Sequence, residues 1–366
     1  MTLTDLPFPG SLRERGESKG ELPTSLVDRF GRVHRDLRIS LTDRCSLRCT
    51  YCMPAEGVPW IAKDNLLSTD ELVRVAAVAA GLGITEVRLT GGEPLLRRDV
   101  VDVVRRMAAI PVRRSSADGG GVSGPRHDML EVSITTNGLR LAELAPALRD
   151  AGLARVNISI DTLRRDRFAE LTRRDRLDDV LAGIDASIAA GFAPIKLNAV
   201  PMRGVNDDEF ADLVRFAVER GAELRFIEQM PLDAGHTWSR AEMVTGEEIL
   251  GVLSREFALE PVGERGSSPA EVFSIDGGPA TVGVIASVTA PFCGACDRVR
   301  LTADGQVRNC LFARTEDDLV PILRGGGSDE DLARVLARSI AVKRAGHGID
   351  EPGFLQPSRP MSAIGG

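Results

Sequence analysis

Short apolar segments rich in β-branched residues alternate with amphipathic helical segments from about residue 35 to about residue 240. The expected strands are residues 37–41, 86–89, 131–135, 155–160, 195–200 and 223–227. The expected helices are about 69–81, 97–109, 141–151, 177–190 and 207–220. Alternation of this kind is typical of a parallel sheet whose strands are joined by helices. About six units allow either a doubly wound sheet or a partial (β/α) barrel, and periodicity does not separate the two.

Polar residues and glycines follow the C-terminal ends of several expected strands. Examples are Thr90–Pro94, Thr136–Gly138, Asp161 and Pro201. Parallel α/β folds gather their chemistry at this edge of the sheet. We therefore expect the functional site there.

The six cysteines of this 366-residue chain form two groups of three, and none is left over. The groups are Cys45, Cys49 and Cys52, then Cys293, Cys296 and Cys310. Disulfide scaffolds belong to small secreted domains, and spacings of two to three residues favour a shared metal over a disulfide. The cysteine pattern thus indicates metal binding in a reducing compartment.

The first triplet has the spacing C-x3-C-x2-C and follows the first expected strand directly. Three soft thiolates within eight residues suit an iron–sulfur cluster. A [4Fe–4S] cluster has four irons, so three cysteines leave one iron open. A structural zinc site normally has four ligands, and no histidine lies nearby in the sequence.

This triplet, with Tyr51 before its last cysteine, resembles the signature of the radical S-adenosylmethionine (SAM) superfamily. The segment Gly91–Pro94, GGEP, resembles that superfamily's second motif. The resemblance implies that the open iron is chelated by the amino and carboxylate groups of SAM. The positions it implies for SAM contacts are Tyr51, Gly92, Glu93, Ser159 and Met230. From the residues alone, Ser159 is also an ordinary strand residue and Met230 an ordinary core methionine.

The second triplet has the spacing C-x2-C-x13-C. Because C-x2-C is the commonest zinc half-site, zinc is an open alternative here. The four histidines, His34, His127, His236 and His347, are not placed locally to supply a fourth ligand.

A radical SAM core followed by this second triplet resembles the GTP 3′,8-cyclase family of molybdenum cofactor biosynthesis. The resemblance covers about residues 35–315 and includes the segments DLRISLTDRCSLRCTYCMP, RLTGGEPLLRRD, ITTNG, NISIDTL, IKLNAV, LRFIEQMPL and FCGACDRVRLTADGQVRNCLF. It implies a partial (β/α)6 barrel of the TIM type, with a C-terminal mixed α+β extension. It also implies a second [4Fe–4S] cluster on Cys293, Cys296 and Cys310, whose open iron the guanine base ligates.

Arg298 and Arg300, two residues apart beside the second triplet, would share one face of an extended segment. Arginine suits phosphate oxygens, although such a pair can also be a solvated strand face. Family positions credited with GTP binding correspond to Arg38, Arg88, Thr135, Lys196, Arg225, Arg298, Val299 and Arg300. Some relatives carry lysine where this chain has Glu86, so that phosphate contact is in doubt. Among the implied catalytic residues are Cys45, Cys49, Cys52, Arg298 and Arg300.

The resemblance implies the following reaction as a hypothesis. An external electron donor reduces the first cluster, which cleaves SAM to methionine and a 5′-deoxyadenosyl radical. This radical abstracts H3′ of GTP, the C3′ radical attacks C8, and reduction gives 3′,8-cyclo-7,8-dihydro-GTP. The product would pass to cyclic pyranopterin monophosphate synthase, and a homodimer is compatible with the resemblance. The rival functions are another radical SAM enzyme with an auxiliary cluster, peptide-modifying or dehydrogenating, and a non-catalytic zinc-stabilised binding protein.

The expected domains are a flexible lead-in (1–34), the partial barrel (35–240), a C-terminal domain closing the barrel (241–345) and a flexible tail (346–366). In the family, the terminal Gly365-Gly366 reaches the active site. Residues 111–127 are expected to form an inserted surface loop.

The net charge of −7 argues against general binding to nucleic acid or membrane surfaces. With no export signal or apolar span, we expect a cytoplasmic protein.

Overall fold

The computed structural model describes residues 22–112 and 129–365, and its strands form one sheet. Most of the predicted 111–127 loop, the first 21 residues and Gly366 lie outside the described residues. The strand order is β12-β11-β10-β1-β2-β3-β4-β5-β6-β9-β8-β7. The first six strands are β1 (Asp36–Ser40), β2 (Glu86–Thr90), β3 (Glu131–Thr136), β4 (Arg155–Ser159), β5 (Ile195–Ala199) and β6 (Glu223–Ile227). They run parallel in chain order, as the alternation predicted.

The C-terminal part of the chain extends this sheet at both ends. β9 (Thr281–Ile285) pairs in parallel with β6, and β10 (Arg298–Leu301) pairs in parallel with β1. Antiparallel strands then continue each end: β8 (Glu271–Ile275) and β7 (Leu259–Pro261), and β11 (Gln306–Arg308) and β12 (Asp317–Asp318). The predicted partial barrel with a mixed C-terminal extension is confirmed.

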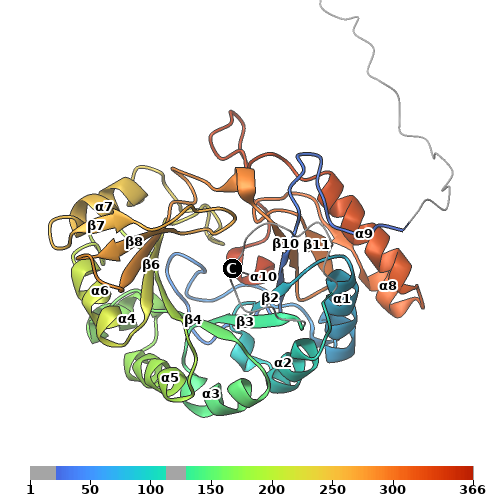
Figure 1. The fold of residues 1–366 in the computed structure, drawn as a ribbon, viewed down its shortest axis with the longest axis horizontal. Coiled ribbons are helices and arrows are strands. Elements are labelled where there is room, and N and C mark those ends of the chain that lie inside the picture. The colour runs from blue at the N-terminus through green and yellow to red at the C-terminus, as the bar shows by residue number, and fades with distance from the viewer. Residues whose placement is uncertain (1–21, 113–128, 366) are drawn as a thin grey trace, which may run out of the picture.

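Helices surround the curved sheet on its outer side (Figure 1). They are α1 (Thr69–Gly81), α2 (Val100–Ala108), α3 (Leu141–Asp150), α4 (Arg165–Thr172), α5 (Leu177–Ala189), α6 (Phe210–Glu219), α7 (Gly246–Leu253), α8 (Val320–Arg324) and α9 (Asp329–Ala341). Short 3-10 turns lie at Lys63–Asn65, Pro94–Leu96 and Cys293–Ala295. Ser68 and Glu71 have the S-x-x-E spacing that predicts a capping box, and the box is present at the start of α1. The sequence pattern also predicts a helix at 316–323, and this prediction is wrong in its first part, where Asp317–Asp318 pair as β12.

Alternation along the strands separates the core from the interior of the barrel. In β1, Leu37 and Ile39 are fully buried in the hydrophobic core, and in β2, Val87 and Leu89 are as well. Successive side chains of a strand point to opposite faces, so the residues between them face inward. Each such apolar side chain stabilises the fold by about 1.5–3 kcal/mol, leaving the inner face free for polar groups.

Segments near both ends of the described chain also contact the barrel. Residues 22–34, expected within a flexible lead-in, include a Val27–Val33 bridge and the buried Leu26. The tail ends in α10 (Met361–Ile364), which lies at the centre of the ring in Figure 1. The flexibility predicted for these segments stays a prediction.

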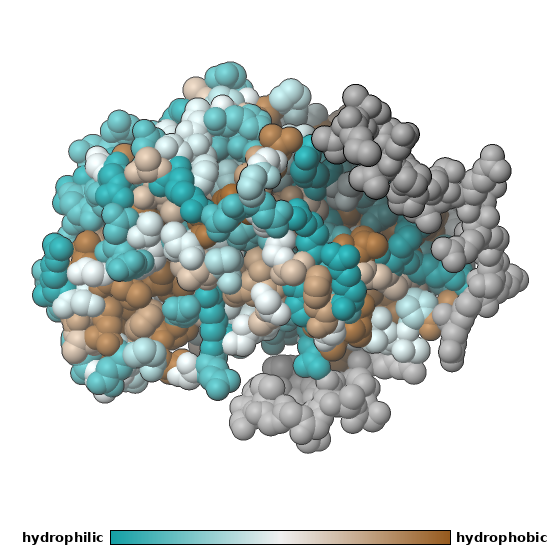
Figure 2. All heavy atoms as spheres, turned by 90° about the horizontal axis from the view of Figure 1, so that it is seen from above, coloured by the Kyte–Doolittle hydropathy of each residue, from teal (hydrophilic) through white to brown (hydrophobic). Residues whose placement is uncertain are grey.

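The face in Figure 2 is mixed: hydrophobic residues gather at the lower left of the view and are scattered among hydrophilic ones elsewhere. Across the described ranges, no helix combines the length and apolar character needed to cross a membrane.

Candidate active site

A cavity of about 310 Å³ opens on the inner face of the barrel. Thirteen of the predicted site residues line it: Arg38, Cys45, Cys49, Tyr51, Cys52, Arg88, Gly92, Thr135, Ser159, Arg225, Met230, Arg298 and Arg300. The predicted residues outside its lining are Glu93, Lys196, Val299, Cys293, Cys296 and Cys310. The structure thus brings residues from six strands and their following loops to one place.

The first cysteine triplet lies in the loop after β1, with all three thiols against the cavity. Burial raises the pKa of Cys45, raises that of Cys49 well above its ordinary value, and raises that of Cys52 to about 12. Free thiols in this environment stay protonated, whereas metal binding deprotonates them. Three soft donors with these properties fit an iron–sulfur cluster, and Asn137 Nδ2 lies 3.8 Å from Cys45 Sγ.

Neither triplet converges on one point. Within residues 22–112 and 129–365, no three His, Cys, Asp or Glu side chains are arranged to hold a single metal ion. A [4Fe–4S] cluster does not require such convergence, because each cysteine binds a different iron.

The GGEP segment passes very close to the cysteine-bearing loop. A Cβ atom on Gly91 would lie 2.4 Å from Thr42 O, and one on Gly92 would lie 2.4 Å from the carbonyl oxygens of Asp43 and Arg44. Gly91 also has a positive φ of 146°. The two glycines therefore allow the loops after β1 and β2 to pack against each other beside the cysteines.

We expect Gly92→Ala to lower both the melting temperature and the affinity for SAM. Because the obstructing atoms are backbone, the loop must shift, at a cost of about 1–3 kcal/mol. The matched control is Gly81→Ala at the end of α1, where nothing lies within 4 Å of the added Cβ. That change should stabilise the helix by about 0.5–1 kcal/mol. Thermal melts and equilibrium dialysis with SAM make the comparison, and equal behaviour of the two variants would contradict the close packing.

Glu93 lies behind the cavity wall and is 1% exposed. Its carboxylate accepts hydrogen bonds from Thr136 Oγ1 (2.7 Å), Asn137 N (2.7 Å) and Leu95 N (2.9 Å). Burial raises the pKa of Glu93, while these hydrogen bonds oppose the rise. Glu93 thus joins the loops after β2 and β3, and its predicted contact with the cofactor stays a prediction.

Asp161 was not among the predicted site residues, yet it lines the cavity directly after β4. Its Oδ2 accepts a hydrogen bond of 2.9 Å from Tyr51 OH, and its Oδ1 accepts one of 2.9 Å from Val200 N. Burial raises the pKa of Asp161 to about 6. The position of Asp161 after a strand was a usable signal, but its pairing with Tyr51 depends on a distant loop.

Arginines form a row across three neighbouring parallel strands; Arg300 is buried, and Arg38 and Arg88 are partly buried. Arg38 in β1 is in register with Arg88 in β2 and with Arg300 in β10. Burial lowers the pKa of all three guanidinium groups, and that of Arg300 falls to about 10. Like charges in register destabilise a sheet unless an anion compensates them.

Asp36 supplies a carboxylate beside this row. Its Oδ2 lies 3.2 Å from Arg298 Nε and 3.7 Å from Arg38 Nε. Burial raises the pKa of Asp36, but Arg38, Arg88, Arg298 and Arg300 bring it below its ordinary value. Two buried donors, Arg38 Nε and Arg298 Nη1, have no hydrogen-bond partner in the described structure. One carboxylate among four arginines, with unpaired donors, fits an anionic ligand.

The remaining residues predicted to bind the substrate are hydrogen-bonded to other side chains, buried, or outside the cavity lining. Arg225 donates to Asn198 Oδ1 (3.0 Å) and Asn157 Oδ1 (2.8 Å), and Thr135 Oγ1 accepts from Asn157. Lys196 lies 3.4 Å from Glu223, outside the cavity lining. Val299 is fully buried between the two arginines of β10, so any contact with the substrate would come from its backbone.

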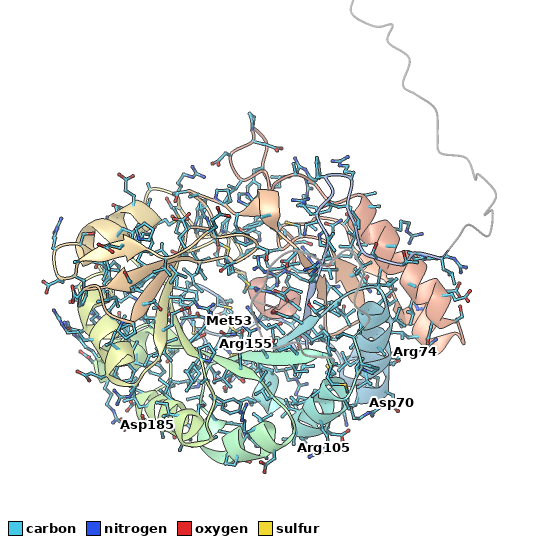
Figure 3. All side chains as sticks on the ribbon, in the orientation of Figure 1. Met53, Asp70, Arg74, Arg105, Arg155 and Asp185 are labelled. Carbon is cyan, nitrogen blue, oxygen red and sulfur yellow. The ribbon has the colours of Figure 1, made fainter. Side chains whose placement is uncertain are left out.

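Glu86 makes an ion pair of 3.0 Å with Arg155, which also pairs with Glu131. Figure 3 shows Arg155 inside the ring, whereas Asp70, Arg105 and Asp185 lie on the outer helices. Arg155 is thus shared between two carboxylates and does not supply the phosphate contact expected of a lysine at position 86.

The second triplet lies at the edge of the site, around the start of β10. Cys293 begins a 3-10 turn, Cys296 ends it, and Cys310 follows β11. Burial raises the pKa of Cys293. Burial also acts to raise the pKa of Cys296, but Lys343 and Arg298 bring it below its ordinary value. Three partly buried thiols again form a donor set that fits an iron–sulfur cluster.

The C-terminal tail forms part of the cavity wall. Met361 and Ser362 line the cavity, and Met361 N donates to Leu232 O at 3.0 Å. Arg300 Nη1 donates to Gly365 O at 2.5 Å. The tail thus contacts a predicted substrate residue directly.

Comparisons with known proteins agree with this arrangement. A model of the radical SAM superfamily matches residues 39–217, and a model described as Molybdenum Cofactor Synthesis C matches residues 222–349. The crystal structure of Streptococcus suis SuiB bound to precursor peptide SuiA has a TM-score of 0.57 at 15% identity and covers 86% of this chain and 69% of that chain. This likeness shows the fold alone. Together, the fold, the first triplet and the GGEP loop define a protein of the radical SAM class, which uses SAM and a [4Fe–4S] cluster.

The particular family follows from closer relatives. A GTP 3′,8-cyclase of Streptomyces coelicolor is 57% identical over 93% of this chain and 96% of its own length. A GTP 3′,8-cyclase of Mycobacterium sp. (strain KMS) is 51% identical over 100% of both chains. The chain belongs to the GTP 3′,8-cyclase family.

Proposed function

We propose that this chain converts GTP to 3′,8-cyclo-7,8-dihydro-GTP, with one iron–sulfur cluster on each cysteine triplet. The observation that carries the proposal is the row of arginines beside the first triplet's cavity. GTP is a polyanion, and five arginines line the cavity, whereas the nearby carboxylates are Asp161 in the lining and Asp36 beside the row. When bound, the first cluster supplies the electron that cleaves SAM to methionine and a 5′-deoxyadenosyl radical, which abstracts H3′ of GTP.

The arginines would hold the triphosphate. Arg38 Nε and Arg298 Nη1 are buried donors without a partner and could donate to phosphate oxygens. Arg88 and Arg300 are in register with Arg38 on the two neighbouring strands. Because these strands are packed against the core, the cations cannot move apart to relieve their repulsion. An anion entering the site would relieve it, so the charges select for phosphate.

Other residues would place SAM and exclude water. Gly92 gives the backbone close access to the cysteine loop, while Asp161 fixes the Tyr51 ring. Ser159 and Met230 complete the cavity wall on the proposed SAM side. The tail residues Met361 and Ser362 cover the same cavity, which would keep solvent hydrogen donors away from a substrate radical.

The proposed second cluster would occupy Cys293, Cys296 and Cys310. Its open iron would bind the guanine base, so that one set of thiols orients the base while the arginines hold the phosphates. We also propose an external electron donor, a cytoplasmic location that keeps thiols reduced, and transfer of the product to cyclic pyranopterin monophosphate synthase. A homodimer is compatible with this proposal.

Anaerobic reconstitution followed by one assay tests the proposal. The full chain is reconstituted with iron and sulfide, and iron is counted; two clusters give about eight irons per chain. Incubation with SAM, GTP and dithionite should then yield 5′-deoxyadenosine and a cyclised nucleotide in equal amounts. Bound zinc in the second triplet, or 5′-deoxyadenosine without cyclised nucleotide, would contradict the proposal.

A further inference from the structure

Lys343 is a buried lysine directly beside the second cysteine triplet. It follows the C-terminal end of α9 and is 3% exposed. Its Nζ lies 2.7 Å from Arg298 O, 2.9 Å from His34 Nε2 and 3.4 Å from Cys296 Sγ. Neither the radical SAM motifs nor the arginine row accounts for this lysine.

His34 fixes the direction in which Lys343 donates its protons. The imidazole is fully buried, and its Nδ1 lies 3.1 Å from Arg32 O. A carbonyl can only accept, so Nδ1 carries the ring proton and Nε2 presents a lone pair to Lys343. Burial, followed by the Lys343 charge, lowers the pKa of His34 to about 4, so the ring is neutral.

Lys343 Nζ has four acceptors within reach in the described structure. The backbone oxygen of Arg298, His34 Nε2 and the sulfur of Cys296 are the nearer three, and the backbone oxygen of Cys296 lies at 3.5 Å. In the described part of the chain, Lys343 forms no ion pair with a carboxylate. A buried ammonium group favours a nearby anion, and among its acceptors the sulfur of Cys296 is the one that can carry negative charge.

In residues 22–112 and 129–365, no lysine or arginine donates to a sulfur of the first triplet, although Arg48 Nη1 donates to the backbone oxygen of Cys45 at 2.6 Å. The Cys45 sulfur faces the neutral amide of Asn137, with Nδ2 at 3.8 Å. The two triplets thus differ in the donor that contacts sulfur: it is the charged Lys343 at Cys296 and the neutral Asn137 at Cys45.

We propose that Lys343, oriented by His34, is a positioning residue that raises the reduction potential of the second cluster through Cys296. The inference rests on the proposed presence of that cluster. Reduction adds negative charge to the cluster and its thiolates, and a fixed ammonium group with a hydrogen bond to sulfur stabilises that added charge. The lysine thereby makes this cluster easier to reduce than its three thiolates alone would allow.

The test is a potentiometric titration of the reconstituted holoenzyme, followed by electron paramagnetic resonance. Lys343→Met keeps the length of the side chain but removes its charge and donors. At a fixed potential, the ratio of reduced to oxidised second cluster should fall at least tenfold, which is 59 mV for a one-electron couple. The first cluster should titrate as in the wild type. The matched control is Arg344→Met, which removes an adjacent charge whose side chain is 61% exposed and pairs with Glu351.

A measurement on the wild-type holoenzyme tests the contact between Lys343 and the cluster without a substitution, so it does not depend on the folding of a variant. Lys343 is one of four lysines in the chain, with Lys19, Lys63 and Lys196. Labelling with ¹⁵N-lysine should therefore give a ¹⁵N hyperfine coupling on the reduced second cluster. Absence of the coupling, or an unchanged potential in a folded Lys343→Met variant with about eight irons, overturns the inference. A wild-type protein that binds only about four irons overturns the second cluster instead.

Discussion

Cys49→Ala is expected to abolish reductive cleavage of SAM and to remove about four irons per chain. Cys49 is partly buried at the cavity, and its neighbours in the triplet, Cys45 and Cys52, cannot hold a cluster with two thiolates. Without the cluster no electron reaches SAM, so the effect is complete loss rather than a slower rate. Iron analysis and chromatography of 5′-deoxyadenosine after incubation with dithionite measure both consequences.

The matched control is Cys296→Ala in the second triplet. This variant should also lose about four irons, but it should keep cleavage of SAM because its triplet lies outside the cavity lining. It should form no cyclised nucleotide, since the proposed guanine ligand is missing. If Cys49→Ala retained SAM cleavage while Cys296→Ala lost it, the assignment of the two triplets would be reversed.

Sequence reasoning located the strands of the barrel well because local signals specify them. Strand β6 spans Glu223–Ile227 as expected, and the capping box of α1 lies where Ser68 and Glu71 placed it. The residues that face the inside of the barrel could also be predicted, because side chains alternate between the two faces of a strand. Helix α4 was missed, since only two of its eight residues are large buried apolar side chains.

Contacts between distant segments were beyond the reach of local patterns. The Tyr51–Asp161 hydrogen bond joins two loops 110 residues apart, and the Lys343–His34 contact joins residues 309 apart. Glu93 is a further example: its carboxylate accepts three hydrogen bonds that join the loops after β2 and β3, and its sequence motif did not indicate them. Such pairings depend on tertiary packing, which no spacing in the sequence encodes.

Arg298→Ala and Arg300→Ala should separate the two halves of the reaction. Both residues lie on β10 and line the cavity, and the side chain of Arg298 is 9% exposed. Loss of a buried charged contact to phosphate costs about 3 kcal/mol, which lowers kcat/KM for cyclised nucleotide on the order of 10²-fold. SAM cleavage with dithionite should continue, because neither arginine contacts the first triplet. Arg338→Ala, whose side chain is 69% exposed, is the matched control and should leave both products unchanged.

The ratio of 5′-deoxyadenosine to cyclised nucleotide distinguishes phosphate binding from other roles better than the rate of either product. If the arginines bind phosphate, each variant should form 5′-deoxyadenosine in excess of cyclised nucleotide, since a loosely held GTP leaves the radical to react elsewhere. Arg300 also donates to Gly365 O, so its variant frees the tail as well as the phosphate site. Arg298 has no contact with Gly365 in the described structure, so a ratio altered in both variants points to the shared role, phosphate binding. An altered ratio in Arg300→Ala alone would assign the effect to the tail, and unchanged turnover of GTP in both variants would contradict the phosphate site.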